Sequence, residues 1–220
     1  MQRRRRRRRR VRRQRLLLIL IVLLALAGLT AQIFRFIGNK EESSEPSYRL
    51  SNEVEEYRYQ VQSIASEYGI EEYTELLLAL MMQESSGLGT DVFQSSECGF
   101  NTEYPRVPGG ITDTEYSIRC GVQEMKYALE QAGVRSPQDL KNIKVALQAY
   151  NFGTNGYLQY MEKNGLKEWS RESAEAFAQM ASQNTPRTEG DPYLNTAGPW
   201  NYGDQRYPEH VLRYYVGLSK

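Results

Sequence analysis

The sequence predicts a mostly α-helical (α+β) domain with a small sheet or long loops beside a groove, preceded by one transmembrane helix. Three observations support this prediction. Apolar residues recur every three or four positions through most of residues 51–220, which is the period of a helix with one buried face. Two segments, 85–114 and 184–206, lack that period and are rich in Gly, Pro, Ser or Thr. An unbroken apolar run follows an arginine-rich N-terminus.

Residues 1–15 contain 11 arginines and no acidic residue. A run of 14 apolar or small residues follows at once, from Leu16 to Leu29, and admitting two polar residues extends it to 19. That length is sufficient to cross a bilayer. Arginines on the N-terminal side hold that end in the cytoplasm. We therefore predict a cytoplasmic Arg-rich segment 1–15, a membrane partner through a transmembrane helix at 16–37, and an extracellular remainder.

A cleaved signal peptide is the alternative interpretation of the N-terminus. Residues 25–27, Ala-Leu-Ala, could be a cleavage site after a short apolar core. The apolar character continues to Ile37, which favours an uncleaved anchor. Removing the 11 N-terminal arginines from the 28 basic residues leaves 17 against 27 acidic ones, a charge of about −10 for residues 16–220. Both interpretations place the folded part of the chain outside the cytoplasm.

Residues 38–50 are polar and contain Pro, Ser and Glu, so we predict a linker there and a domain over 51–220. Ser51 can cap the first helix of the domain. The second helix is apolar nearly all round, which predicts a central, buried position. Any sheet would lie within 88–112. The predicted helices cover about 51–69, 72–84, 114–133, 142–151, 155–163, 171–183 and 208–216, with a short helical segment opened by Ser136-Pro137.

Glu84 is the candidate catalytic acid because it ends the apolar helix 72–84. The C-terminal end of a helix carries partial negative charge, which disfavours a second negative charge. The apolar residues before Glu84 also disfavour its ionisation. Both effects raise the pKa and keep a proton available for donation, as a general acid requires near neutral pH. The alternative is a glutamate that only points into solvent.

Four short motifs occur in a fixed order along the domain. They are Gln83-Glu84-Ser85-Ser86, Asp91-Val92-Phe93-Gln94-Ser95-Ser96, Ala149-Tyr150-Asn151-Phe152-Gly153 and Tyr207-Pro208-Glu209-His210-Val211-Leu212-Arg213-Tyr214-Tyr215. Together they resemble the lytic transglycosylase and goose-type lysozyme superfamily. The likeness is greatest to its Gram-positive lysozyme-like branch of membrane-anchored cell-wall muramidases, and it covers about residues 52–217. Each motif alone is common, whereas the four in this order are specific.

The resemblance implies a function and roles for particular residues. It implies a peptidoglycan hydrolase that cleaves the β-1,4 bond between N-acetylmuramic acid and N-acetylglucosamine, with Glu84 as the proton donor. Gln94 would line the sugar groove, although only this residue of the family's Gly-Leu-Met-Gln motif is retained. Tyr150 would lie against the catalytic carboxyl group, and Asn151 near the sugar at the cleavage point. The substrate-binding residues implied are Ser85, Gln94, Ser95, Tyr150 and Asn151.

Asp91, seven residues after Glu84, is the candidate second catalytic carboxylate. Glycoside hydrolysis commonly uses two carboxylates. If Asp91 orients water, the enzyme is a hydrolase; if it only holds the loop, the 6-hydroxyl of the substrate could attack and leave a 1,6-anhydro sugar. The sequence leaves lysozyme and lytic transglycosylase open, and we favour hydrolysis.

Cys98 and Cys120 both fall in the exported part, where a disulfide between them is possible and two free thiols are the alternative. We expect no metal and no organic cofactor. Two other classes of function are alternatives. One is an inactive glycan-binding module of a secretion or conjugation apparatus. The other is a structural membrane component whose arginines bind nucleic acid or anionic lipid. Topology and headgroup attraction already explain the arginines. We therefore expect peptidoglycan strands as the partner, no nucleic acid, and candidate partners in wall remodelling, conjugation or secretion.

Overall fold

The computed structural model describes residues 48–215 of the chain. The Arg-rich segment 1–15, the predicted transmembrane helix 16–37 and most of the predicted linker 38–50 lie outside the described residues. Within residues 48–215, none of the helices is both long and apolar enough to span a bilayer. The transmembrane helix and the boundaries before residue 48 therefore stay predictions.

The first predicted helix is divided in two by a tight turn. α2 (Asn52–Glu56) begins at Ser51, whose hydroxyl accepts a hydrogen bond from the Val54 N–H, and α3 (Arg58–Glu67) follows. The capping role predicted for Ser51 is confirmed. The Tyr57 N–H bonds to the Val54 carbonyl at 3.1 Å, and this bond across three residues tightens the turn and ends α2.

The second predicted helix lies at the centre of the domain, as expected. A 3-10 turn, η1 (Glu71–Tyr73), leads into α4 (Thr74–Ser85). Every residue from Leu76 to Met81 is fully buried, because α4 contacts α2, α3 and α9 on its different sides. The helix ends at Ser86, which adopts a left-handed conformation with φ 57°.

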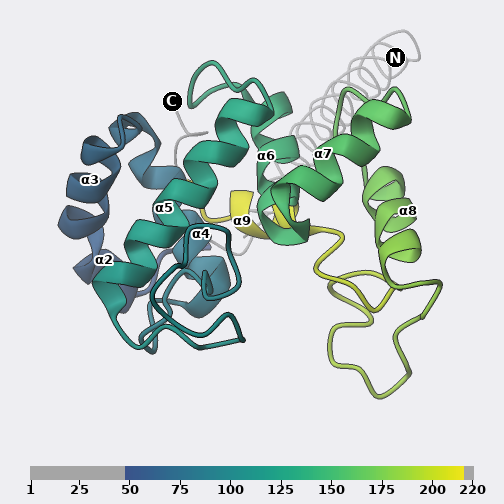
Figure 1. Ribbon diagram of the computed structural model, residues 1–220, viewed down its shortest axis with the longest axis horizontal. Helices are drawn as coiled ribbons and strands as arrows, with labels where there is room; N and C mark the ends of the chain where they lie inside the picture. The colour runs from purple at the N-terminus through teal and green to yellow at the C-terminus, as the bar shows by residue number, and fades with distance from the viewer. Residues whose placement is uncertain (1–47, 216–220) are drawn as a thin grey trace, which may run out of the picture. The chain divides into compact units, whose positions relative to one another are not determined.

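Five further helices complete the described part of the domain (Figure 1). They are α5 (Thr114–Gln131), α6 (Leu140–Phe152), α7 (Thr154–Lys163), α8 (Arg171–Ala181) and α9 (Tyr207–Leu212). The helical segment predicted at Ser136-Pro137 is wrong: these residues form a turn. The helix predicted over about 142–151 is α6, which begins slightly earlier, at Leu140, because the Asp139 side chain accepts a hydrogen bond from the Asn142 N–H and caps it.

α9 is shorter than predicted. The sequence predicts that this helix continues through Tyr215, whereas α9 ends at Leu212. The N–H groups of Tyr214 and Tyr215 bond to carbonyls three residues back, so the chain tightens into a turn there. The Tyr215 hydroxyl donates to the Pro137 carbonyl at 2.9 Å and fixes this end of the described chain against the turn before α6.

The small sheet predicted within 88–112 is absent from the described residues, which contain only an isolated bridge between Pro186 and Trp200. In this loop, side chains form the hydrogen bonds with backbone N–H and carbonyl groups that a neighbouring strand would otherwise form. Asn101 donates to the carbonyls of Ser96 and Tyr104 and accepts from two N–H groups. Residues 48–215 are therefore α-helical with long loops, which is the other form of the predicted fold class.

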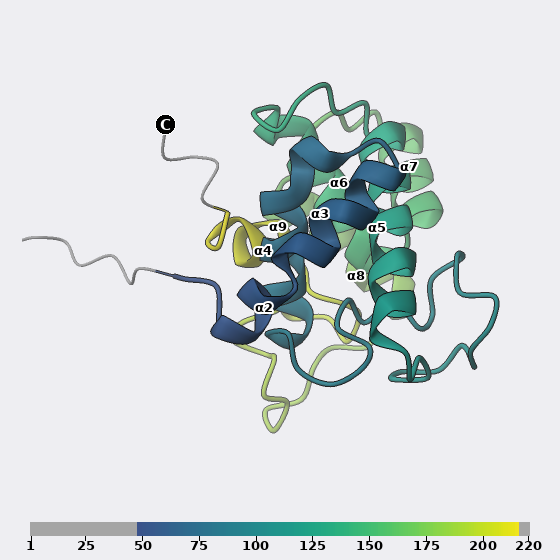
Figure 2. The same ribbon diagram turned by 90° about the vertical axis from the view of Figure 1, so that its left-hand side faces the viewer.

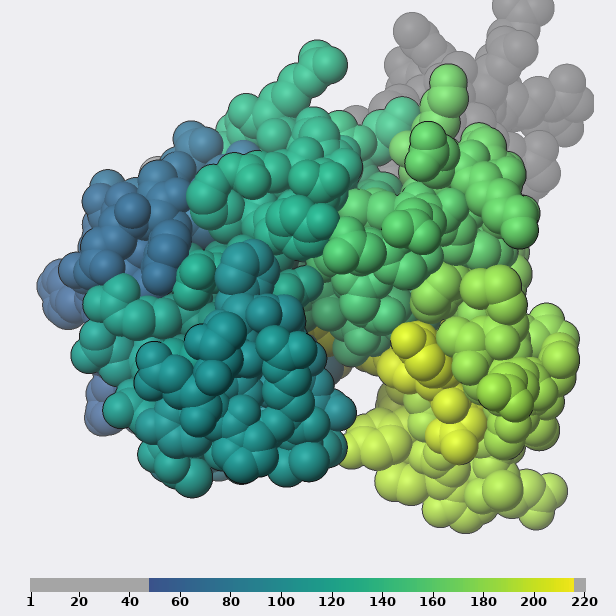
Figure 3. Space-filling view, in the orientation of Figure 1, coloured from purple at the N-terminus to yellow at the C-terminus, as the bar shows by residue number. Residues whose placement is uncertain are grey.

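The loops 85–114 and 184–206 lie at the same end of the helical body in both ribbon views (Figures 1 and 2). Figure 3 shows a hollow between the surface formed by the first loop, in teal, and that formed by the second, in yellow-green. The two predicted irregular segments thus face each other across an opening.

α6 lies between two hydrophobic clusters. Ile143 and Leu147 pack into the larger cluster, which α6 shares with α2 to α5 and α9. Val145 and Phe152 pack into a smaller, aromatic-rich cluster with residues of α7 and α8. One helix therefore joins both halves of the domain, and its C-terminal end meets the opening between the loops.

Candidate active site

Glu84 lies in the last turn of α4, where hydrogen bonds join the helix end to the loop that follows. The Ser85 hydroxyl donates to the Val92 carbonyl at 2.8 Å and accepts from the Gly87 N–H at 3.0 Å. The Ser86 carbonyl accepts from the Ser51 hydroxyl at 2.8 Å. Because these bonds fix both ends of the turn, the position of Glu84 is set by the helix and not by a mobile loop.

Glu84 is partly exposed at the wall of a cavity of about 640 Å³. The cavity is lined by Gln83, Glu84, Asn151, Arg187, Tyr193, Thr196, Ala197, Asn201, Tyr202, Gly203, Asp204, Tyr207, His210 and Arg213. Burial among these groups raises the pKa of Glu84 to about 7, and the negative charges of Asp204 and Asp91 act in the same direction. The carboxyl group therefore keeps its proton to near-neutral pH while it faces an open cavity.

Tyr207, at the start of α9, donates its hydroxyl proton to Oε1 of Glu84. This hydrogen bond favours the ionised carboxylate and so opposes part of the rise in the pKa of Glu84. Burial raises the pKa of Tyr207 well above its usual value, so the phenol remains a donor. Tyr207 belongs to the last of the four motifs, but the resemblance implied no role for it. The one sequence feature that marks its position is Pro208, which indicates the first turn of a helix.

Tyr150 lies beside Tyr207, and burial followed by the charge of Glu84 raises the pKa of Tyr150 well above its usual value. Its hydroxyl donates to the Phe93 carbonyl at 2.9 Å. The position against the catalytic carboxyl group that the resemblance implies stays a prediction. The two tyrosine rings are stacked, with centroids 6.5 Å apart and 13° between their planes. Tyr150 thus supports the tyrosine that holds Glu84 and ties the end of α6 to the loop after α4.

Asn151 joins α6 to the second loop. Its Oδ1 accepts the Asp204 N–H at 2.7 Å. Gly203, the residue before Asp204, has a φ of 45°. A Cβ at this position would come within 2.7 Å of Asn151 Oδ1 and of the Phe152 ring, so this close approach of the backbone requires glycine. Asn151 and Tyr202 line both the Glu84 cavity and a neighbouring one, so the two cavities adjoin at these side chains.

The neighbouring cavity has a volume of about 930 Å³ and includes Gln94, Ser95, Tyr150 and Asn151 in its lining. Gln94 is exposed, adopts φ 46°, and donates from its amide to the Asp91 carbonyl at 2.9 Å. Ser95 is buried and donates to the Ser117 carbonyl at 3.0 Å. Four of the five substrate-binding candidates therefore line this cavity. The fifth candidate, Ser85, is not among the residues that line this cavity, and its hydroxyl bonds to backbone groups of the loop after α4.

Asp91 is buried, with 4% of its surface exposed, and both carboxylate oxygens are occupied. Oδ1 accepts from the Ser95 N–H, the Ser95 hydroxyl and the Ser117 hydroxyl. Oδ2 accepts from the N–H and hydroxyl of Ser96. A carboxylate with this many donors has little capacity left for water. Its geometry corresponds to the loop-holding role that the sequence left as the alternative to catalysis.

Cys98 and Cys120 are neighbours with free thiols. A hydrogen bond from Cys120 is the main cause that lowers the pKa of Cys98, and the same pairing raises the pKa of Cys120. Cys98 lies in the lining of the cavity that contains Gln94. The predicted disulfide therefore stays a prediction, made between two side chains that already lie together.

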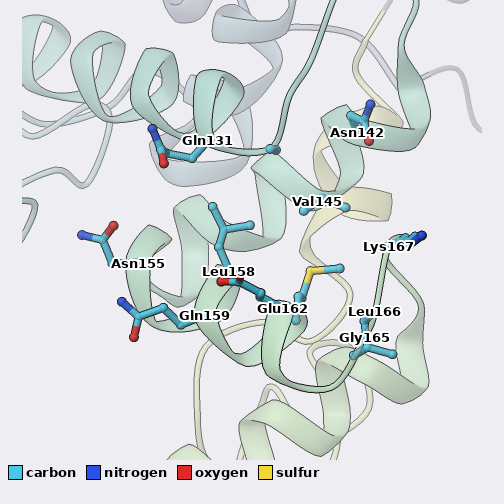
Figure 4. Close-up of a pocket in the computed structure, with 12 residues that line it drawn as sticks. Gln131, Asn142, Val145, Asn155, Leu158, Gln159, Glu162, Gly165, Leu166 and Lys167 are labelled. Atoms are coloured by element: carbon cyan, nitrogen blue, oxygen red, sulfur yellow. The ribbon is translucent and has the colours of Figure 1, made fainter.

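Outside the Glu84 cavity, the described residues contain no cluster of metal-binding side chains, and a further cavity lies between α6 and α7. No group of three or more His, Cys, Asp or Glu in residues 48–215 could hold a metal ion. Figure 4 shows a further cavity of about 650 Å³ between α6 and α7, lined by apolar residues such as Val145 and Leu158 together with several amides. Glu162 is the single carboxylate in that lining, so the cavity offers no pair of carboxylates for glycoside hydrolysis.

The fold and the Glu84 cavity together define a mostly helical domain that presents a carboxyl group of raised pKa at the wall of an open cavity. This chain belongs to the Lysozyme-like family, whose model matches residues 51–215. The sequence-based assignment to a Gram-positive lysozyme-like family of cell-wall enzymes is thereby confirmed.

Curated relatives and a solved structure agree with this assignment. The bifunctional muramidase/DL-endopeptidase CwlT of Bacillus subtilis (strain 168) is 33% identical over 84% of this chain and 48% of its own length. The uncharacterized membrane protein YocA of the same strain is 30% identical over 71% of this chain and 65% of its own length. A crystal structure of a lipoprotein-like protein of the NLP/P60 family from Staphylococcus aureus subsp. aureus Mu50 superposes with a TM-score of 0.65 and 32% identity, covering 78% of this chain and 55% of that one. The chain thus spans about half to two thirds of these relatives.

Proposed function

We propose that this chain is a peptidoglycan glycan-strand hydrolase that cleaves the β-1,4 bond between N-acetylmuramic acid and N-acetylglucosamine. Glu84 is the general acid that protonates the leaving glycosidic oxygen. The observation that carries the proposal is a carboxyl group with a pKa near 7, held by Tyr207 at the wall of an open cavity. The relative CwlT is named as a muramidase, and this name supports peptidoglycan strands as the substrate.

Two adjoining cavities support a polymer as substrate. The Glu84 cavity meets the Gln94 cavity at Asn151 and Tyr202, so the lining continues on one side of the acid. Amide and phenol groups there can bond sugar hydroxyls and acetamido groups, and tyrosine rings suit sugar faces. Gln94, Ser95, Tyr150 and Asn151 would contact the strand in this arrangement, with Ser85 supporting the loop between them.

A lytic transglycosylase is the second candidate function, and the burial of Asp91 favours it. If no carboxylate activates water, the 6-hydroxyl of the muramic acid residue can attack and leave a 1,6-anhydro product. A glycan-binding module without activity is the third candidate, and it gives no reason for a protonated Glu84 in the cavity.

Location is part of the proposal. A transmembrane helix at 16–37 would place the N-terminus in the cytoplasm and residues 51–220 on the outer face of the cell membrane, next to peptidoglycan. The name of the YocA relative as a membrane protein supports membrane association. Candidate partners then belong to wall remodelling, conjugation or secretion.

The proposal is tested with the purified full-length protein and its Glu84→Gln variant on peptidoglycan, with the released muropeptides analysed by mass spectrometry. We expect products with reducing ends from the wild type and none from the variant. Products lighter by one water would assign the lytic transglycosylase reaction. Equal cleavage by both proteins would remove Glu84 from the mechanism, and no cleavage by either would leave the binding module.

A further inference from the structure

The Glu84 cavity contains a second carboxylate, Asp204, which the sequence analysis did not identify. Its side chain is 16% exposed and lines the same cavity as Glu84. Oδ1 accepts the Arg206 N–H at 2.9 Å, and Oδ2 lies 2.5 Å from Nδ1 of His210. A carboxylate can accept about four hydrogen bonds, so Asp204 retains capacity for a water molecule, unlike Asp91.

The backbone of Asp204 is fixed on both sides by α6. Its N–H donates to Asn151 Oδ1 at 2.7 Å, and its carbonyl accepts from the Gln148 amide at 2.8 Å. Gln148 is fully buried, and its own Oε1 accepts from the Trp169 indole at 2.9 Å. A catalytic side chain must be held within about 0.5 Å by supporting contacts, and Asp204 has such support although it lies in a loop.

One face of α9 contacts both carboxyl groups. Tyr207 donates to Glu84, and His210, three residues later on the same face, pairs with Asp204. The two carboxyl groups therefore meet the same helical turn from different parts of the chain. The negative charge of Asp204 also acts on Glu84 and raises its pKa, which agrees with their proximity.

We propose that Asp204, held by His210, is the carboxylate that takes a proton from the attacking water, and that Asp91 only anchors its loop. This inference rests on the proposed function. In the step, the water oxygen bonds to the anomeric carbon of the muramic acid residue, and one water proton passes to Asp204. The bond from that carbon to the glycosidic oxygen breaks, and Glu84 donates its proton to the leaving oxygen. Exchange with solvent then restores both carboxyl groups.

The first test compares initial rates of the full-length wild type, Asp204→Asn and Asp191→Asn on peptidoglycan. Asp191 lies in the same loop and pairs with Arg187, so it is a matched control for the loss of a carboxylate. Loss of a general base costs typically about 10²- to 10⁴-fold in rate. We therefore expect Asp204→Asn to lose at least about 100-fold in kcat with little change in KM, and Asp191→Asn to stay within a few-fold of the wild type.

The second test separates chemistry from folding by adding sodium azide to Asp204→Ala. Azide needs no base, because its nitrogen can bond to the anomeric carbon directly while Glu84 still protonates the leaving oxygen. We expect azide to restore cleavage and to yield a glycosyl azide, detected by mass, with no such rescue in Asp91→Ala. An unfolded variant could not be rescued.

Several outcomes would overturn the inference. Asp204→Asn within about threefold of the wild type would do so, as would a wild type that releases only 1,6-anhydro products. Loss of the melting transition in both Asp204 variants would make Asp204 a structural residue. Where the products keep reducing ends, cleavage by the wild type and its absence in Glu84→Gln would leave the proposed hydrolase standing, whereas exclusively 1,6-anhydro products would assign the lytic transglycosylase reaction instead. A wild type that cleaves nothing would instead remove the proposed function itself.

Discussion

Replacing Glu84 with Gln should stabilise the domain, and only at neutral and alkaline pH. The pKa of Glu84 is about 7 in the folded protein against an ordinary value of 4.5. Between these values the folded state binds more protons than the unfolded state, so stability falls as pH rises through this range. At about 1.4 kcal/mol per pKa unit, the cost above pH 7 reaches about 3 kcal/mol.

The glutamine variant has no charge to bury, so its free energy of unfolding should exceed that of the wild type by about 2–3 kcal/mol at pH 8. The lower figure allows for water on the cavity side of the group. For a domain of this size each kcal/mol raises Tm by about 2–4 °C. The advantage should fall steeply toward pH 4.5 and disappear below it, where the wild-type carboxyl group is protonated in both states.

Urea unfolding and thermal melting of the full-length proteins from pH 4 to 9 measure this difference without any substrate. Glu162→Gln is the matched control because Glu162 is exposed and remote from the Glu84 cavity. Its difference from the wild type measures the effect of removing a surface carboxylate and is subtracted from that of Glu84→Gln. A Glu84→Gln variant that is no more stable than the wild type at pH 8, or equally more stable at every pH, would refute the reasoning that burial raises the pKa of Glu84.

Three further predictions follow from individual contacts. Tyr207→Phe removes a hydrogen bond to a charged group, worth about 1.5–3 kcal/mol, so the alkaline limb of the pH–rate profile should move up by about 1–2 pH units; a stationary limb would contradict the assignment. Asp91→Asn leaves buried donors without partners and should lower the urea unfolding free energy by about 3 kcal/mol, and an unchanged value would mean that the loop does not depend on Asp91. Mild oxidation should join Cys98 to Cys120, seen as the loss of two hydrogens in the intact mass. It should also raise stability by roughly 3 kcal/mol, with no change in a Cys120→Ser control.

The helices could be predicted wherever the apolar period was regular. α4 was placed at the centre because its residues are apolar all round, and its burial confirms this. The predicted helix boundaries are wrong where capping side chains or tight turns, and not the apolar period, set the ends of a helix. Ser136-Pro137 forms a turn and not a helical segment, and α6, capped by Asp139, begins at Leu140, slightly before the predicted start at about 142. The Tyr57 turn divides a helix whose apolar face is continuous. The predicted sheet failed for the same reason, since Asn101 satisfies backbone groups that a strand would have paired.

The site was only partly predictable because its contacts join distant segments. Glu84 could be singled out from its own neighbours, since the helix that precedes it is apolar. Tyr207 acts on it from 123 residues away, and Asp204 enters the cavity through bonds to α6 more than 50 residues earlier. No local spacing reveals such partners. Asp91 shows the converse limit: its spacing from Glu84 suggested a shared groove, but local spacing does not reveal its burial or its hydrogen bond from Ser117 on α5.

The placement of α6 between two hydrophobic clusters has a mechanical consequence. Ile143 and Leu147 belong to one cluster, and Val145 and Phe152 to the other. A hinge between the clusters would have to bend α6 itself, and an unbroken helix with no internal Pro or Gly resists bending. The two clusters therefore keep nearly the same relative position, so any widening of the opening would have to come from the two loops and not from the helical body.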